Sequence, residues 1–401
     1  MPKHRSVLLL VAVIALLLVG LASAYAEFTP VAAVADTRWA ALIAAVAAVL
    51  LAGRRAVRPV GGPRGVWGLL AALGLGVAAW AAVLLFGTYR EERVVFRSGA
   101  VRLAGTLLAP RTDGPHPAVV YLHGAGRERR REFGYEAKLY ARHGVAALAY
   151  DKRGAGESGG DTYDTDYRGY AADAAAAIRY LCSRADIRCS CVGLFGQSQG
   201  GWVAPVVAAE TVPGVAFVVV RSSTPLSPAD QVLYETGRGI RDGGFTEADV
   251  REATALQRRV LEYQRSGPPD PALSGDLAAA AKKPWFRLAK LPPELYDRKE
   301  YDWWRSVMDF QTGPLWKRVR APVLAISGGR DPKSDAHASQ EEIRQLLAAG
   351  GNRDFTGVLY PKMEHGGIEW RLGVRIPPPR FPEGYPELLV RWTGERIDRC
   401  R

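Results

Sequence analysis

The segment that most constrains the fold is Cys191–Gly201, with the sequence CVGLFGQSQGG. Its apolar run, Val192–Phe195, is typical of a short buried strand, and a helix is predicted to follow. Gly-x-Ser-x-Gly at such a strand-to-helix junction is called a nucleophile elbow. The sharp turn forces Ser198 into a strained backbone conformation, so only glycine fits at Gly196 and Gly200. The same pentapeptide also occurs by chance in glycine-rich turns, so this interpretation requires partners for the serine elsewhere in the chain.

Positive charge is concentrated in the first quarter of the chain. The 401 residues carry a formal net charge of +12, and residues 1–90 contribute +6, with eight Lys or Arg against Glu27 and Asp36. These cations flank apolar runs, a pattern typical of membrane topology and not of a nucleic-acid surface. The sequence contains no zinc-finger, basic-helix or RNA-binding signature, so no nucleic-acid partner is expected.

Three apolar segments, at residues 6–26, 38–54 and 65–89, are candidate membrane spans. The first and third contain 21 and 25 uncharged residues, and each is long enough to cross a bilayer as a helix. The middle segment has 15 uncharged residues and spans only if Arg38 and Arg54 extend to the headgroups. We therefore expect residues 1–90 to form a membrane region of about three helices in the lipid bilayer.

The basic residues also predict the orientation of these helices. Lys3 and Arg5 would hold the N-terminus inside, and the arginines between residues 54 and 64 would hold the second loop inside. Three crossings then place the rest of the chain outside the cytoplasm. If the middle segment lies in the interface instead, two crossings return the chain to the cytoplasm. The first segment could alternatively be a cleaved signal peptide, which would leave the outward placement unchanged.

Three of the four cysteines cluster just before the elbow. Cys182 paired with Cys189 or Cys191 would staple a helix to the elbow strand, which suits an oxidising, extracytoplasmic space. Three reduced cysteines are the alternative. Zinc is not expected, because Cys-x-Cys lacks the usual ligand spacing and no histidine is near.

Residues 91–400 show alternating strands and helices, which predict a mostly parallel sheet covered by helices on both faces. Two strands, at 93–98 and 101–109, are predicted to form an antiparallel entry hairpin. The other predicted strands lie at residues 117–122, 145–150, 192–195, 215–220, 322–327 and 355–360. The predicted helices of this part lie at residues 131–143, 167–183, 199–210, 336–348 and 385–397.

Two candidate partners of Ser198 follow later strands. Asp331 comes after strand 322–327 and His365 after strand 355–360, so both are expected beside Ser198 at the carboxyl edge of the sheet. An imidazole can take the serine proton, and a carboxylate can hold the imidazole in the required tautomer. Alternatively, Asp331 only caps the next helix and His365 is an ordinary loop residue. Asp335, four residues after Asp331, could also compete with it for the role of the acid.

The loop after strand 117–122 is a candidate oxyanion hole, with the sequence His123-Gly124-Ala125-Gly126. The backbone N–H of Ala125 or Gly124, together with that of Gln199, would bind the oxygen of a tetrahedral intermediate. His123 is expected to brace this loop and not to act as a base.

The loop after strand 145–150 reads Asp151-Lys-Arg-Gly-Ala-Gly-Glu-Ser158. A phosphate site is not expected, because no helix opens at its glycines, and a structural loop with Asp151 and Arg153 paired to each other is predicted. Four arginines at 127 and 129–131 are interpreted as a solvated helix start, with an anionic substrate or lipid headgroup as the alternative.

About a hundred residues separate the strands at 215–220 and 322–327, too many for one crossover helix. We expect a helical lid at about residues 224–318, with helices at 227–237, 246–266, 277–281 and 299–310. It should sit over Ser198 and set specificity. Its large apolar side chains are expected to form mainly its own core, with some lining the pocket: Trp285, Phe286, Trp303, Trp304, Met308 and Phe310.

Taken together, the elbow, the two loops and the order serine, acid, histidine resemble the α/β-hydrolase superfamily over residues 93–398. With the Trp303-Trp-Arg run, the motifs look like bacterial serine hydrolases labelled serine-aminopeptidase-like, acyl-peptidase-like or esterase-like. The resemblance implies a triad of Ser198, Asp331 and His365 that cleaves a carboxylic ester, thioester or amide. The substrate would be a small acyl or peptide-like compound, with no metal or organic cofactor.

Rival functions remain open. An aminopeptidase, an acyl-peptidase or an acyltransferase would use the same triad. A non-catalytic receptor or scaffold would keep the fold, although such proteins usually lack a triad member, and here all three are present.

Overall fold

The computed structural model describes residues 87–400 apart from 213, 268–269, 293–294, 296–298 and 371–379, and five isolated positions between 46 and 76. The predicted membrane spans at 6–26, 38–54 and 65–89 therefore lie almost wholly outside the described residues. Among the helices that are described, none is both long and apolar enough to cross a bilayer.

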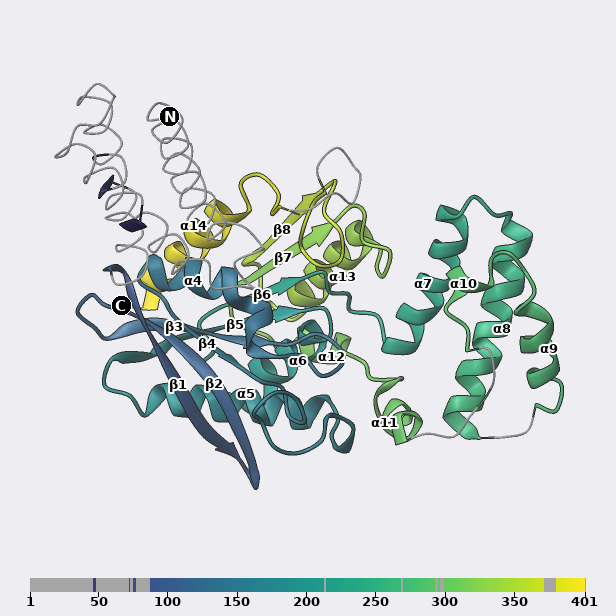
Figure 1. Ribbon diagram of the computed structural model, residues 1–401, viewed down its shortest axis with the longest axis horizontal. Helices are drawn as coiled ribbons and strands as arrows, with labels where there is room; N and C mark the ends of the chain where they lie inside the picture. Colours follow the sequence, from purple (N-terminus) through teal and green to yellow (C-terminus); the bar gives the residue numbers. More distant parts are fainter. Residues whose placement is uncertain are drawn as a thin grey trace, which may run out of the picture.

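In the described residues, one eight-stranded sheet forms the middle layer of the α/β core, in the order β1-β2-β4-β3-β5-β6-β7-β8 (Figure 1). The pairs β1–β2 and β2–β4 are antiparallel, and every pair from β4 to β8 is parallel. The predicted entry hairpin and mostly parallel sheet are confirmed. The strands are β1 (Tyr89–Ser98), β2 (Val101–Pro110), β3 (His116–Leu122), β4 (Ala146–Tyr150), β5 (Ile187–Gln197), β6 (Val218–Arg221), β7 (Val323–Gly328) and β8 (Phe355–Tyr360).

The central strands are apolar on both faces because helices cover both sides of the sheet. Successive residues of a strand point to opposite faces. Val120 and Leu194 belong to one core, whereas Tyr121 and Phe195 belong to the other. The first core is completed by α5 (Tyr167–Cys182), α6 (Gly200–Val206) and α13 (Ala336–Ala349), and the second by α4 (Gly134–Arg142) and α14 (Tyr385–Ile397).

The helix after the elbow is shorter than the predicted 199–210. It contains Pro205, which has no N–H to donate to the preceding turn. The regular helix α6 ends at Val206, and a π-helical turn, η5 (Val207–Thr211), continues the chain. The proline therefore explains why one predicted helix has two parts.

A disulfide joins Cys182, the last residue of α5, to Cys189 near the start of β5, with 4.7 Å between their Cα atoms. The structure thus selects one of the two pairings that the sequence allowed. Cys191 remains a free thiol buried in β5, and Cys400 is also free. The crosslink fixes the connection that leads into the elbow strand.

Six helices lie in the described part of the lid segment between β6 and β7. They are α7 (Pro228–Asp242), α8 (Glu247–Ser266), α9 (Leu273–Ala280), α10 (Phe286–Ala289), α11 (Lys299–Val307) and α12 (Gly313–Trp316). Figure 1 shows α7 to α10 as a bundle beside the α/β core, with α11 between the two. The bundle has its own apolar core, in which Trp285 is 1% exposed. The placement of the lid directly over Ser198 remains a prediction.

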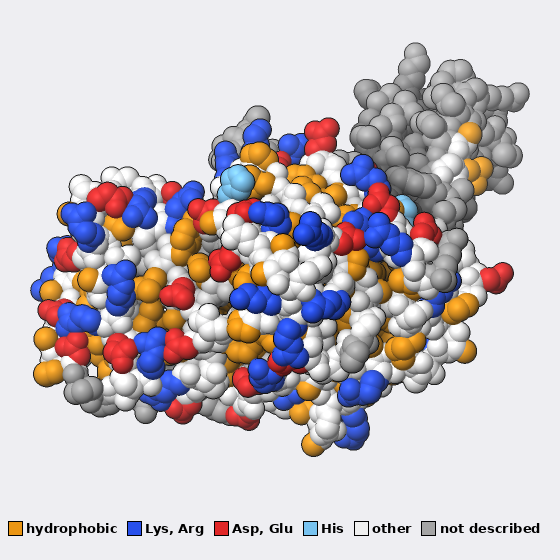
Figure 2. Space-filling model, turned by 180° about the vertical axis from the view of Figure 1, so that it is seen from behind, with side chains coloured by type: hydrophobic (Ala, Val, Ile, Leu, Met, Phe, Trp, Pro, Cys, Tyr) orange, Lys and Arg blue, Asp and Glu red, His pale blue; other side chains and the backbone are white. Residues whose placement is uncertain are grey.

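Both tryptophans of α11 face the α/β core. Trp303 donates its indole N–H to the carbonyl of Thr165 at 2.6 Å, and Trp303, Trp304 and the nearby Phe310 pack against the first core. On the outer face of the lid, side chains of both charges are interspersed (Figure 2), and pairs such as Arg259–Asp270 and Arg265–Asp309 form salt bridges. This mixture is unlike the single-sign surface that nucleic-acid binding requires.

The disulfide should stabilise the fold. It removes conformational freedom from a short loop of the unfolded chain, which is worth about 2 kcal/mol. We expect a Cys182→Ser/Cys189→Ser double variant to lose about this much free energy of unfolding in urea titrations of the full-length protein. Cys400→Ser, which removes a free thiol, should leave the value unchanged. An unfolding midpoint equal to wild type in the double variant would contradict the expectation.

Candidate active site

The strained serine of the elbow is present. Ser198 has φ of +51°, in the left-handed region, and its N–H donates to the carbonyl of Arg221 at 3.0 Å. A Cβ on Gly196 would lie 2.5 Å from the carbonyl oxygen of Gly200, and a Cβ on Gly200 would lie 2.2 Å from that of Leu122. Both positions therefore exclude any residue other than glycine.

The three predicted triad side chains meet. His365 Nε2 lies 2.9 Å from Ser198 Oγ, and His365 Nδ1 lies 2.8 and 3.0 Å from the two carboxylate oxygens of Asp331. Because an ionised carboxylate only accepts hydrogen bonds, Nδ1 carries the proton and Nε2 can accept one from the serine hydroxyl. The Asp331 side chain is 1% exposed and that of His365 is 20% exposed, so the imidazole is open to a ligand.

Close contact between two loops brings the acid and the histidine together. A Cβ on Gly328 would lie 2.2 Å from the carbonyl oxygen of Met363, so only glycine lets the ends of β7 and β8 approach this closely. The competing acid, Asp335, is engaged elsewhere, because its carboxylate caps α13 by accepting two backbone N–H groups. Asp331 is thus the acid that reaches His365.

The expected oxyanion loop requires one correction. The N–H of Gly124 donates to Glu128 Oε2 at 2.7 Å, so the prediction that names Gly124 as a possible oxyanion donor is wrong. For the N–H groups of Ala125 and Gln199, by contrast, the described part of the chain provides no acceptor. These two groups are the ones available to a ligand oxygen.

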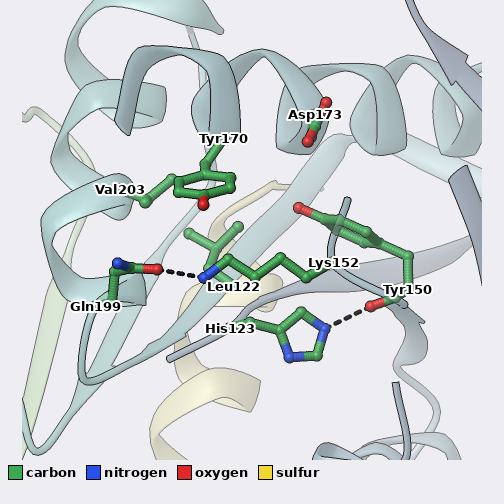
Figure 3. Close-up of a pocket in the computed structure, with 8 residues that line it drawn as sticks. All are labelled: Leu122, His123, Tyr150, Lys152, Tyr170, Asp173, Gln199 and Val203. Carbon is green, nitrogen blue, oxygen red and sulfur yellow. Dashed lines mark hydrogen bonds between the residues drawn. The ribbon is translucent and has the colours of Figure 1, made fainter. Parts of the chain in front are cut away.

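His123 and Glu128 hold the oxyanion loop in place. The imidazole Nε2 of His123 donates to the carbonyl of Tyr150 (Figure 3), as expected for a brace, and Nδ1 lies 3.4 Å from Glu128 Oε2. Burial raises the pKa of Glu128, but the contacts with His123 and Gly124 more than offset it, so the pKa lies below its usual value. Sequence reasoning missed Glu128, although a carboxylate four residues beyond the glycine was a signal.

Sequence reasoning also missed Lys152, the second residue of the Asp151 loop. The residue is 4% exposed, and its side chain points toward Gln199 beneath the ring of Tyr170 (Figure 3). The ammonium donates to the carbonyl of Gly124 at 2.8 Å and to the side-chain oxygen of Gln199. Burial lowers the pKa of Lys152 to about 7. The cavity around it has a volume of about 10 Å³, room for about one water molecule and not for a substrate.

The predicted pairing of Asp151 with Arg153 is wrong. Asp151 accepts from the backbone N–H and the guanidinium of Arg130, at 2.9 and 3.1 Å, whereas Arg153 pairs with Asp173 on α5. The loop curls back on itself, so that the Asp151 carboxylate points toward Arg130, which follows the oxyanion loop in sequence. Arg130 also pairs with Glu157, so this arginine is structural.

The described residues contain no cluster of three or more His, Cys, Asp or Glu side chains placed to bind a metal ion. The chemistry that this geometry supports is proton transfer from Ser198 to His365, with an oxygen held near Ala125 and Gln199.

Comparison with known proteins identifies relatives of two kinds. Esterase EstD of Thermotoga maritima is 27% identical over 248 residues, 60% of this chain and 52% of the esterase. An uncharacterized protein of Mycobacterium tuberculosis is 31% identical over 145 residues, 36% of this chain and 50% of that protein. The chain thus spans about half the length of the curated relatives it matches. A solved esterase of Pyrococcus furiosus covers 78% of this chain and 91% of its own at 17% identity, with a TM-score of 0.49.

The strand order and the elbow are those of the α/β-hydrolase fold that the sequence resembled. The family model of the X-Pro dipeptidyl-peptidases matches residues 98–345, which is more than half of the chain and includes the elbow and Asp331. The chain therefore belongs to the S15 family of peptidases, the X-Pro dipeptidyl-peptidase family.

Proposed function

We propose that this protein is a serine hydrolase that cleaves a carboxylic ester, thioester or amide through an acyl-Ser198 intermediate. The observation that carries the proposal is the continuous hydrogen-bonded chain from Ser198 Oγ through His365 to Asp331. A serine hydroxyl is a weak nucleophile at neutral pH, and this arrangement is the one that activates it.

In the first half of the reaction, Ser198 Oγ attacks the substrate carbonyl carbon while its proton moves to His365 Nε2. The carbonyl oxygen becomes an oxyanion, held by the N–H groups of Ala125 and Gln199, and each such donor stabilises the transition state by about 3 kcal/mol. Asp331 stabilises the imidazolium that forms. The tetrahedral intermediate then expels the alcohol, thiol or amine, which takes the proton from His365 and leaves the acyl group on the serine.

In the second half, water attacks the acyl carbon and gives a proton to the same imidazole. Collapse of this second tetrahedral intermediate releases the carboxylic acid and returns the proton from His365 to Ser198. If another nucleophile replaces water, the same steps transfer the acyl group, which is the acyltransferase alternative.

The substrate class rests on the relatives. The name of the Thermotoga relative supports a small acyl ester, and the family description supports an amide after an X-Pro dipeptide. We place the ester first, because an esterase is among the relatives and a simple ester makes no demand for an amine-binding site. The rival peptidase activity is tested by comparing hydrolysis of aminoacyl-prolyl amides with hydrolysis of esters of short acids.

We further propose that the protein is anchored in a membrane by residues 1–90 and that its catalytic domain faces away from the cytoplasm. Two observations support this proposal. The apolar segments and their flanking arginines predict three crossings. The Cys182–Cys189 disulfide is of the kind that persists in oxidising compartments.

Covalent labelling tests the proposed chemistry. Wild-type protein in detergent should react with a fluorophosphonate probe, and Ser198→Ala should abolish both labelling and ester hydrolysis, with kcat roughly a millionfold lower. His365→Ala should lower kcat to a similar extent, because the two residues act as one unit. Ser222→Ala is a matched control, since Ser222 is another serine with positive φ, at +49°, but is buried outside the triad, and this variant should keep full labelling. Folded wild type that neither labels nor turns over any ester or amide would favour the scaffold alternative.

A pair of reporters tests the topology. Alkaline phosphatase, which is active only outside the cytoplasm of a bacterial host, should be active when fused after Arg401, because three crossings deliver this end outside. Green fluorescent protein at the same site should stay dark after export. Bright fluorescence with an inactive phosphatase would contradict the proposal and point to two crossings.

A further inference from the structure

Lys152 occupies an unusual position, because it contacts both parts of the chain that offer an oxyanion donor. Its ammonium donates to the carbonyl of Gly124, in the loop after β3, at 2.8 Å. It also donates to the side chain of Gln199, in the elbow after β5. The triad chemistry assigns no role to this buried cation.

The carbonyl that Lys152 binds belongs to the peptide group between Gly124 and Ala125. That group is planar and trans, so its C=O and its N–H point in opposite directions. A cation at the carbonyl oxygen of Gly124 therefore turns the Ala125 N–H away from Lys152. A charge-assisted hydrogen bond at the oxygen also polarises the amide, which makes the N–H a stronger donor.

We propose that Lys152 is a positioning residue of the oxyanion hole, which orients and polarises the Gly124–Ala125 peptide and ties it to Gln199. This inference rests on the proposed function of Ser198. Lys152 does not touch the substrate. It acts through the two backbone N–H groups, so its effect should appear only when negative charge develops on the substrate oxygen.

The surroundings leave the charge of Lys152 without an ion-pair partner among the described residues. The ammonium lies against the face of the Tyr170 ring, whose centroid is 4.5 Å away. Asp173, which lines the same cavity, pairs with Arg153, and Glu128 pairs with the oxyanion loop. The titratable groups that face Lys152 are therefore His123 and Glu128 from the loop after β3, Tyr150 from β4, and Tyr170 and Asp173 from α5.

The pH dependence has a definite sign. Burial lowers the pKa of Lys152 to about 7, and the nearby charge of Glu128 opposes this only in part. The ammonium is present below that pH and is lost as the pH rises through it. The value of kcat should therefore fall as the pH rises past about 7 and Lys152 loses its charge.

The test compares full-length wild type with Lys152→Met, which keeps the length and removes the charge, and Lys152→Gln, which keeps a donor without charge. We expect kcat for a short-chain ester at pH 6.5 to fall between tenfold and a hundredfold in both variants, with KM within twofold of wild type. The fall of kcat near pH 7 should disappear. Lys138→Met removes a lysine of similar burial on α4 and should leave kcat and the pH profile unchanged.

Each other outcome refutes the proposal. Variants with wild-type kcat and pH profile would overturn it. A loss of kcat that is equal at every pH, together with a raised KM or a lowered melting temperature, would also overturn it, because that result indicates a lysine with a structural role only. Should both variants fail to fold, wild type alone decides, since a kcat that still rises from pH 6 to 9 is incompatible with the proposal. Wild type that neither turns over ester nor labels refutes the proposed function as well, whereas an active wild type matched by Lys152→Met refutes this inference only.

Discussion

Close backbone contact at glycine is the constraint on which the rest of the structure depends. Gly200 touches the carbonyl of Leu122 at the end of β3, and Gly328 touches the carbonyl of Met363 beyond β8. The first contact fixes the elbow against the strand that leads into the oxyanion loop, and the second fixes Asp331 against the loop of His365. A Cβ at either glycine would meet backbone atoms, which cannot rotate away. The separation between the backbone segments at each contact is therefore possible only with glycine.

Most of the α/β core could be predicted from local patterns. Strand Phe355–Tyr360 and helix Tyr385–Ile397 have the bounds expected from their periodicity. The elbow strand begins at Ile187, earlier than its apolar run, because Ile187 pairs with His116 of β3 and the register then shifts before Val192 pairs with Ala118. Such pairing depends on the neighbouring strand, which a local pattern cannot show. The triad was predictable because each member directly follows a strand whose direction is known.

Contacts between charged side chains were not predictable in the same way. Asp151 is two residues from Arg153 in sequence, yet it pairs with Arg130, because the tight loop turns the two neighbours in different directions. Nothing in the local sequence distinguished Lys152 from a surface lysine. Its burial depends on α5 and α6 closing over it. The residues of the triad could be predicted from local patterns, whereas the residues that position them depend on contacts between distant parts of the chain.

The separate apolar core of the lid has a consequence for how this protein can diversify. Ile240, Val250, Val260 and Leu277 pack among themselves, away from the sheet. Substitutions on the lid surface, or its replacement by another helical insertion, would leave the packing of β3 and β5 intact. Lineages that share this sheet can therefore exchange this helical segment while inheriting the reactive centre unchanged.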